Sequence, residues 1–411
     1  MDNSKDTLVV IYRSLMVGGI ENYVTSLINN ALSLNKRVVW VCHTKKLYSP
    51  VYKSIVEDKR LEIIKTDFSS INIYKLPKID LSDQGPVKIM VFDIFRLFQA
   101  YKLKEKHKNV DILYCVPHFT GSSIFPEQGI RYKLLKKITR KLFSKIYDRI
   151  FKEGNLYFFS SKHYEVLQNN YGIYFSSPQN YLVPKITKKE EYDEESFRKV
   201  YRSKSFTIIS PGRFEFPHKG YLLGLIRAYG KLKPKYPHLN LLIIGDGQDK
   251  DKVETAISKL PEKSRNGIIL KSSISYEELK NNMKTVNLNI SVAGCATMGA
   301  RIGLITLPAR HYNYDCEVYG FYPKSRSLAT ETKSGFPVEP YIEKVINMDE
   351  EEYIYYSKLA YHTFDDEQYC PNFPFDKREN SIFVPSKTEF IFVWFTYNFQ
   401  RFFHHITKFY G

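Results

Sequence analysis

The sequence predicts an α/β protein with two domains in tandem, each a parallel sheet with helices in its crossover connections. Short runs rich in β-branched residues alternate with helix-like patterns along most of the 411 residues, and this alternation is typical of parallel sheets. A charged stretch near the middle interrupts it once, and a chain of this length is expected to form about two domains.

In the first half, strands are expected wherever a short β-branched run stands between turn signals. These runs are 8–12, 38–42, 61–65, 111–116, 156–160 and 181–183. Apolar residues recur with helical spacing in 20–34, 87–103 and 162–170. We assign residues 1–184 to a first domain that faces the acceptor and the membrane, for reasons given below.

Residues 185–205 turn strongly charged and have no strong apolar stripe, so we interpret them as a linker region. A second alternating series follows and defines a domain over 206–388. Its expected strands are 206–210, 241–244, 268–270, 288–292 and 304–307, and its expected helices are 221–232, 249–260, 276–284 and 350–362. Residues 389–411 are predicted to form an aromatic and basic C-terminal helix.

The composition narrows the function classes. Lys plus Arg is 61 and Asp plus Glu is 44, a net charge of +17 that favours phosphate-bearing partners. Nucleic acid is one such partner, but no RNA-recognition or helix-turn-helix signature is present, so we expect no nucleic-acid binding. The 5 cysteines lie far apart, which predicts neither a metal site nor disulfides. With no transmembrane or secretion segment recognised, we expect a cytoplasmic protein.

The richest loop is Ser210–Tyr221, which directly follows an expected strand. It carries Arg213 and Lys219 six positions apart, and Gly220 then opens a helix. An arginine fork, a lysine point charge and a helix N-terminus together form a good receptor for a diphosphate. The alternative is a solvated loop with two ordinary surface cations.

Three short motifs in order give the chain a resemblance to a known family. They are Gly18-Gly19-Ile20-Glu21, Gly212-Arg213 with Lys219-Gly220, and Ile244-Gly245-Asp246-Gly247. Over about residues 7–365 the chain resembles the GT-B fold glycosyltransferases of family 4, also called glycosyl transferases group 1. The resemblance implies two Rossmann-like domains that face a cleft, with a C-terminal helix that crosses back to the first domain.

The resemblance also implies an activity: a metal-independent, retaining transferase of the hexosyl type. No cofactor is implied, since the UDP- or GDP-linked nucleotide-sugar is the substrate. Catalytic roles fall on Arg213, Lys219 and His118, the last of which follows the expected strand 111–116. Gly18 and Gly19 would let backbone N–H groups approach the donor, although an ordinary strand-to-helix turn explains them equally well.

The chain departs from this family at a pair of glutamates eight positions apart. No glutamate lies between Glu278 and Glu317. Met298 or Gly299 stands at the second glutamate position, and Ile290 or Ser291 at the first. Donor contacts are therefore expected from elsewhere, namely from Gly294, Cys295, Ala296, Thr297 and Glu317. The same departure motivates an alternative, a non-catalytic GT-B-like subunit that partners an active glycosyltransferase.

Residues 131–152 form a cationic amphipathic helix, with nine cations and the single acid Asp148. Such a helix is typical of an element bound to an anionic membrane surface. The predicted membrane-facing residues are Lys133, Lys136, Lys137, Arg140 and Lys141. The alternative is a surface helix that docks on the sheet through its apolar stripe. For the aromatic tail we favour packing on the first domain over lipid contact.

These observations favour a peripheral membrane enzyme at the cytoplasmic face that glycosylates a lipid-linked or cell-surface saccharide. The natural setting is polysaccharide biosynthesis, such as capsule or lipopolysaccharide. A sugar-nucleotide epimerase of related architecture is the other enzyme class considered, but it would leave the membrane-facing features without a purpose.

Overall fold

A computed structural model describes the chain in segments. The described residues are 6–16, 18–43, 48–67, 78–81, 85–107, 109–117, 133–159, 161–172, 174, 182–323, 334–365, 367–376, 385–395 and 398. For residues 133–139, 142, 161, 162, 166 and 170 only the backbone is described. His118 lies outside these residues, as do the side chains of Lys133, Lys136 and Lys137.

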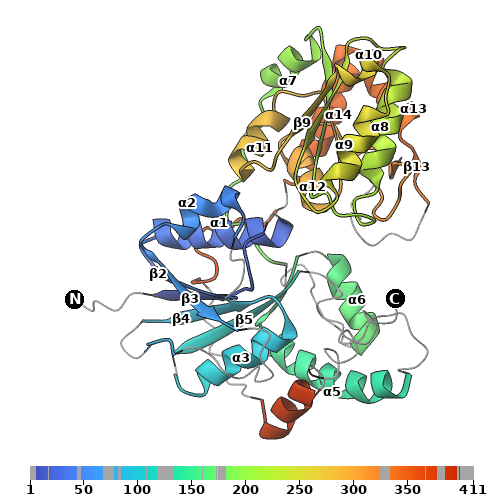
Figure 1. The fold of residues 1–411 in the computed structure, drawn as a ribbon. Helices are drawn as coiled ribbons and strands as arrows, with labels where there is room; N and C mark the ends of the chain where they lie inside the picture. The colour runs from blue at the N-terminus through green and yellow to red at the C-terminus, as the bar shows by residue number, and fades with distance from the viewer. Residues whose placement is uncertain are drawn as a thin grey trace. The chain divides into compact units, whose positions relative to one another are not determined.

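The chain divides into two compact units. The first comprises Met1–Met16, Tyr23–Thr187 and Tyr369–Gly411, and the second comprises Val17–Asn22 and Lys188–Gln368. Each unit contains one parallel sheet and its helices (Figure 1). The predicted fold class, a tandem pair of α/β domains, is confirmed.

The sheet of the first unit has the strand order β3-β2-β1-β4-β5-β6, with all neighbours parallel. Its strands are β1 (Thr7–Ile11), β2 (Arg37–His43), β3 (Leu61–Thr66), β4 (Val87–Val91), β5 (Val110–Val116) and β6 (Leu156–Phe158). Its helices are α1 (Gly19–Ser33), η1 (Pro50–Tyr52), α2 (Lys53–Val56), α3 (Ile94–Lys104), α5 (Lys133–Lys152) and α6 (Ser161–Tyr171).

One predicted helix is wrong in its first part. Residues 87–103 were predicted as a single helix, but 87–91 are the central strand β4, and α3 starts only at Ile94. The Asp93 side chain separates the two by accepting hydrogen bonds from the backbone N–H groups of Phe95 and Arg96. A strand buried on both faces has a continuous apolar pattern, which merges with the pattern of the helix that follows.

The sheet of the second unit has the order β11-β10-β7-β8-β9, again parallel throughout. Its strands are β7 (Phe206–Pro211), β8 (Leu239–Ile244), β9 (Ile268–Lys271), β10 (Leu288–Ser291) and β11 (Thr306–Pro308), and a small antiparallel pair joins β12 (Glu317–Val318) to β13 (Phe336–Pro337). The helices are α7 (Glu194–Tyr201), α8 (Tyr221–Leu232), α9 (Lys250–Ser258), α10 (Glu262–Arg265), α11 (Tyr276–Met283), α12 (Ala293–Arg301), α13 (Glu339–Ile346) and α14 (Glu350–His362).

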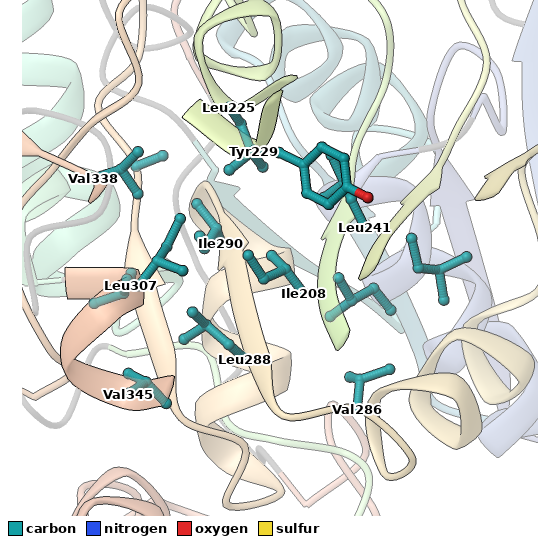
Figure 2. Packing of buried hydrophobic residues seen from close by; sticks show 14 of the residues in the cluster. Ile208, Leu225, Tyr229, Leu241, Val286, Leu288, Ile290, Leu307, Val338 and Val345 are labelled. Carbon is teal, nitrogen blue, oxygen red and sulfur yellow. The ribbon is translucent and has the colours of Figure 1, made fainter. Parts of the chain in front are cut away.

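Aliphatic residues of the strands and helices form the core of this second unit. Figure 2 shows Ile208, Leu241 and Ile290 from neighbouring strands beside Leu225 and Tyr229 of α8. Burying such side chains supplies about 1.5–3 kcal/mol each. This core fixes the ends of β7, β8 and β10, and therefore the loops that follow them.

The region predicted as a linker contains the helix α7. Asp193 caps its N-terminus, and Phe197 is buried in the second core. Arg198 of α7 also forms ion pairs of 2.8 Å with Glu350 and 2.7 Å with Glu351 at the start of α14. The segment is charged because it forms these pairs while it packs against the second unit.

The chain end packs on the first unit, as predicted. Residues 387–395 are helical, and Phe390 and Val393 are buried in the first core. The Phe390 ring meets that of Phe98 of α3, with 5.2 Å between the ring centroids. None of the described helices is long and apolar enough to cross a membrane.

Candidate functional site

Two loops of the second unit interlock at the carboxyl end of its sheet. The loop after β7 and the loop after β8 are joined by backbone hydrogen bonds, from Gly212 N to Ile244 O at 2.9 Å and from Phe214 N to Asp246 O at 2.9 Å. The Asp249 carboxylate accepts a further bond of 2.7 Å from the backbone N–H of Phe216. These bonds tie the loop that carries the two predicted cations to the loop after β8.

Two glycines make this close approach possible. A Cβ atom at Gly245 would collide with the carbonyl oxygen of Gly212, and one at Gly247 would collide with that of Phe214. The predicted turn Gly245-Asp246-Gly247 thus has a packing role. It lets the loop after β8 pack closely against the loop of Arg213 and Lys219.

The two cations differ in their surroundings. Arg213 is half-exposed and lies 3.7 Å from the carboxylate of Glu215. Lys219 is partly buried, and loss of solvent lowers the pKa of its ammonium group to about 8. Cys295 acts against this shift, the positive charge of Arg213 lowers the pKa further, and Glu215 raises it. A lysine that has already lost part of its hydration costs less to bring into contact with an anion.

The interaction between Lys219 and Cys295 connects this loop to the N-terminus of α12. Val292 precedes the helix without a side-chain cap, and Ala293 has the positive φ of 49°. The first backbone N–H groups of a helix have no partner within it, and they attract anions. The four predicted donor-binding residues of this region, Gly294, Cys295, Ala296 and Thr297, all lie in these first turns. The side chain of Ala296 is buried, so it offers only its backbone.

Asn289, a buried residue that sequence reasoning missed, positions this helix end. Its Nδ2 donates to the carbonyl oxygen of Cys295 at 3.1 Å and to the hydroxyl of Thr306 at 3.3 Å. A Cβ atom at Gly299 would collide with the Asn289 amide. The residue lies inside a strand, and its contacts depend on the meeting of β10, β11 and α12, so no local sequence signal could have found it.

The positions where the resemblance would place two glutamates are buried. Ile290 and Ser291 are fully buried, Met298 is 6% exposed and Gly299 is buried. The hydroxyl oxygen of Ser291 has no hydrogen-bond partner in the described part of the chain. The missing carboxylates thus coincide with core positions in this chain.

Glu317 lies in a different setting from the one proposed for it. On β12 its carboxylate forms an ion pair of 2.6 Å with Arg310 and accepts from Gly335 N at 3.2 Å. The Arg310 hydrogen bond holds the pKa of this carboxyl below its usual range.

The loop that follows β11 brings a second residue that sequence reasoning missed, His311, to the loop of Arg213 and Lys219. The rings of His218 and His311 stack with centroids 4.7 Å apart and an interplanar angle of 14°. Tyr312, at φ 55°, donates its backbone N–H to His218 O at 3.3 Å. His218 lies inside the motif from Arg213 to Lys219, but its distant partner could not be found from sequence spacing.

Among the remaining predicted residues, Gly18 and Gly19 belong to the short segment Val17–Asn22 of the second unit, whereas Arg140 and Lys141 lie in the first unit. Gly19 begins α1, and a Cβ atom there would meet nothing within 4 Å, whereas one at Gly18 would meet only the flexible end of Glu21. Arg140 donates to Asn169 O at 3.1 Å, and Lys141 is exposed. Within the described residues, no group of three or more His, Cys, Asp or Glu side chains is placed to hold a metal ion.

Comparison with solved structures identifies the architecture. A glycosyltransferase of Rickettsia africae aligns with a TM-score of 0.53 at 14% identity, over 89% of this chain and 95% of that one. Anabaena HepE, solved with UDP and glucose, aligns at 0.54 and 10% identity over 88% and 95%. WaaG, a glycosyltransferase involved in lipopolysaccharide biosynthesis, aligns at 0.50 and 14% identity over 88% and 95%. The fold is GT-B.

Sequence comparison gives a local similarity. The chain is 33% identical over 99 residues to an uncharacterized glycosyltransferase of Methanocaldococcus jannaschii. This stretch makes up 24% of this chain and 23% of that protein. No family model matches the sequence. The structural likeness to glycosyltransferases thus extends over nearly the whole chain, whereas the sequence similarity to one covers about a quarter of it.

Proposed function

We propose that this protein is a glycosyltransferase that transfers a hexosyl group from a nucleotide-diphosphate sugar, UDP- or GDP-linked, to a saccharide acceptor. The observation that carries the proposal is the meeting of Arg213, the partly buried Lys219 and the uncapped N-terminus of α12 at one end of the second sheet. The GT-B fold and the local similarity to a glycosyltransferase support the same reading.

The chemistry follows from these charges. When the bond between the anomeric carbon and the diphosphate oxygen breaks, negative charge develops on the leaving nucleoside diphosphate. The Arg213 fork, the Lys219 ammonium and the N–H groups at the start of α12 stabilise that charge. Fixed charges of this kind supply a large share of the rate enhancement, because they need no reorganisation during the reaction. Transfer is expected to retain the anomeric configuration and to need no metal.

The acceptor is proposed to be a lipid-linked or cell-surface saccharide at the cytoplasmic face of the membrane, in polysaccharide biosynthesis such as that of capsule or lipopolysaccharide. The excess of positive charge supports this setting because anionic lipid attracts basic proteins. Donor contacts from Gly18, Gly19, His118 and Glu317 remain part of the proposal.

Nucleotide binding tests the proposal most directly. A panel of UDP, GDP, ADP and CMP with their sugar conjugates is tested by thermal shift and calorimetry. A ligand at one hundred times its Kd stabilises the fold by about 2.7 kcal/mol, so one diphosphate should raise Tm by about 5–10 °C. The Arg213→Ala/Lys219→Ala double variant should lose that shift.

A matched control removes the same charge elsewhere in the second unit. Lys263 and Arg265 are exposed on α10, and the Lys263→Ala/Arg265→Ala variant should bind the nucleotide like the wild type. If no nucleotide binds the folded wild-type protein, or both double variants bind equally well, the proposed donor site is wrong.

The buried glutamate positions favour one alternative, a non-catalytic GT-B subunit that supports an active glycosyltransferase. The two functions differ in turnover. An enzyme should hydrolyse its donor slowly in the absence of acceptor, and the Arg213→Ala/Lys219→Ala variant should lose that hydrolysis. Donor binding without hydrolysis or transfer would identify the non-catalytic subunit.

A further inference from the structure

The helix formed by residues 387–395 has an apolar face that the first unit does not cover. Phe390 and Val393 are buried in the core, whereas Ile391, Trp394 and Phe395 are 66%, 37% and 54% exposed. These three follow one another at the spacing of one helix face. The aromatic tail therefore packs on the first domain and still presents apolar side chains to its surroundings.

The apolar stripe of α5, in contrast, is occupied. In the half of α5 whose side chains are described, Phe143, Ile146, Tyr147 and Ile150 are all fully buried in the core of the first unit. They serve the docking role that the sequence left open for this helix, so they cannot insert into a bilayer. What this half of α5 presents outward is charge, from the exposed Arg140, Lys141, Lys145, Arg149 and Lys152.

The charged surface of α5 and the apolar surface of the terminal helix adjoin each other. Arg149 of α5 forms an ion pair of 3.1 Å with Glu389 of the terminal helix. The Phe143 and Phe392 rings lie 5.8 Å apart between the same two helices. In Figure 1 the terminal helix is drawn in dark red beside α5. The exposed cations of α5 and the exposed apolar side chains of the terminal helix thus lie on two helices that contact each other on the first unit.

Few described acids offset this charge. Glu389 is buried and paired with Arg149, and Asp148 is paired with Lys152 at 2.7 Å. Lys387 adds a further exposed cation at the start of the terminal helix. The face therefore suits an anionic partner that also accepts apolar groups.

We propose that this face docks the protein on an anionic bilayer, with Ile391, Trp394 and Phe395 in the headgroup layer and Lys141, Lys145 and Arg149 against lipid phosphates. Tryptophan and phenylalanine next to lysines favour this layer. Three apolar side chains are too few for a stable protein interface, which takes about 20–30 residues a side. The proposal deepens the proposed function, on which it rests for the acceptor that the bilayer would hold.

Tryptophan fluorescence gives a direct readout. The chain has 2 tryptophans, and Trp40 is fully buried while Trp394 is exposed. Vesicles of phosphatidylcholine with phosphatidylglycerol should therefore shift the emission of Trp394 to the blue and sediment the protein. Pure phosphatidylcholine should do so weakly, and high salt should reverse the binding because it screens the lysines.

Two variants separate the apolar from the charged contribution. Ile391→Ser/Phe395→Ser should abolish the blue shift, and Lys141→Gln/Lys145→Gln should weaken anionic-vesicle binding roughly 25-fold, at about fivefold for each lysine near the surface. Ile269→Ser/Tyr355→Ser is the matched control, since these residues of the second unit are also about half exposed or more. All three variants carry surface changes, and their melting temperatures report folding.

The proposal is overturned if wild-type protein does not bind anionic vesicles at low salt, or if it binds them with an unchanged Trp394 spectrum. Equal binding by the serine variant and its control also overturns it. Self-association that is lost only in Ile391→Ser/Phe395→Ser would assign the face to a second copy instead. The nucleotide thermal shift on the same samples tests the proposed function separately, because vesicle binding needs no donor.

Discussion

Lys219 shows how one residue's surroundings determine its chemistry. In an exposed loop a lysine stays charged up to about pH 10. Here the loss of solvent and the nearby positive charge of Arg213 lower the pKa to about 8, against the opposing effects of Cys295 and Glu215. Only the ammonium form attracts a diphosphate. A modest rise in pH should therefore weaken the attraction between Lys219 and the diphosphate.

Donor affinity should therefore fall at alkaline pH. With a pKa of about 8, roughly nine-tenths of Lys219 is charged at pH 7 and roughly one-tenth at pH 9. We expect the Kd for a nucleotide-diphosphate sugar to be almost constant below pH 7.5 and about tenfold higher at pH 9. Calorimetry with the sugar conjugate avoids the titration of a terminal phosphate, since its diphosphate has none.

The control for this profile is Lys219→Arg. An arginine keeps its charge throughout this range, so its binding should not weaken between pH 7 and pH 9. A flat profile for the wild type would contradict the pKa assigned to Lys219. The same slope in both proteins would assign the titration to another group.

At the scale of elements, the position of α12 depends on its neighbours more than on its own sequence. The helix is short, lacks a side-chain cap and begins at a residue with positive φ. The bond from Asn289 to the Cys295 carbonyl holds its first turn against β10 and β11. A buried amide of this kind is costly to lose, because it leaves the carbonyl without its partner.

Replacing Asn289 should therefore affect both stability and binding. We expect Asn289→Ala to lower the free energy of unfolding by about 1–3 kcal/mol. We also expect about tenfold weaker binding of the nucleotide diphosphate, because the first turn of α12 is released. Urea unfolding and calorimetry measure the two effects.

Asn240→Ala on β8 is the comparison variant, since the Asn240 side chain makes a long, solvent-exposed bond of 3.5 Å to His238 O. It should leave binding unchanged. Weakened stability with full nucleotide affinity in Asn289→Ala would show that α12 does not need this contact to present its N-terminus.

At the scale of the whole molecule, the chain end completes the first unit. Residues 387–395 lie far from β1 in sequence, yet Phe390 fills a place in the first core against Phe98. The ammonium group of Lys102 also lies 4.0 Å from the centre of the Phe390 ring. The stability of the first unit thus depends on a segment that follows the second.

Removing the Phe390 ring should destabilise the first unit. Large-to-small changes at buried phenylalanines cost about 3–5 kcal/mol, and we expect that loss for Phe390→Ala. The neighbouring Ile391→Ala should cost far less because Ile391 is exposed. Tryptophan fluorescence in urea measures the effect, since Trp40 and Trp394 both belong to the first unit. Equal losses in the two variants would contradict the packing described here.

The resemblance to the GT-B glycosyltransferases implied the return of the aromatic tail. The sequence by itself determined the parallel α/β halves and the loop of Arg213 and Lys219. These are local patterns: strand and helix periodicities, glycine turns and cations at strand ends are set by residues close together in the chain. The prediction of one helix over residues 87–103 failed because β4 is buried on both faces. The apolar pattern of that strand does not show where the strand ends.

Only the tertiary structure decided the rest. The lowered pKa of Lys219, the hold of Asn289 on α12 and the pairing of Glu317 with Arg310 all depend on residues that distant strands bring together. The structure also decided which apolar face is covered, with that of α5 buried in its described half and Ile391, Trp394 and Phe395 left outside. Solvent exposure and contact between distant segments come from packing, and a periodicity along one chain does not encode how much of each amphipathic helix the core will cover.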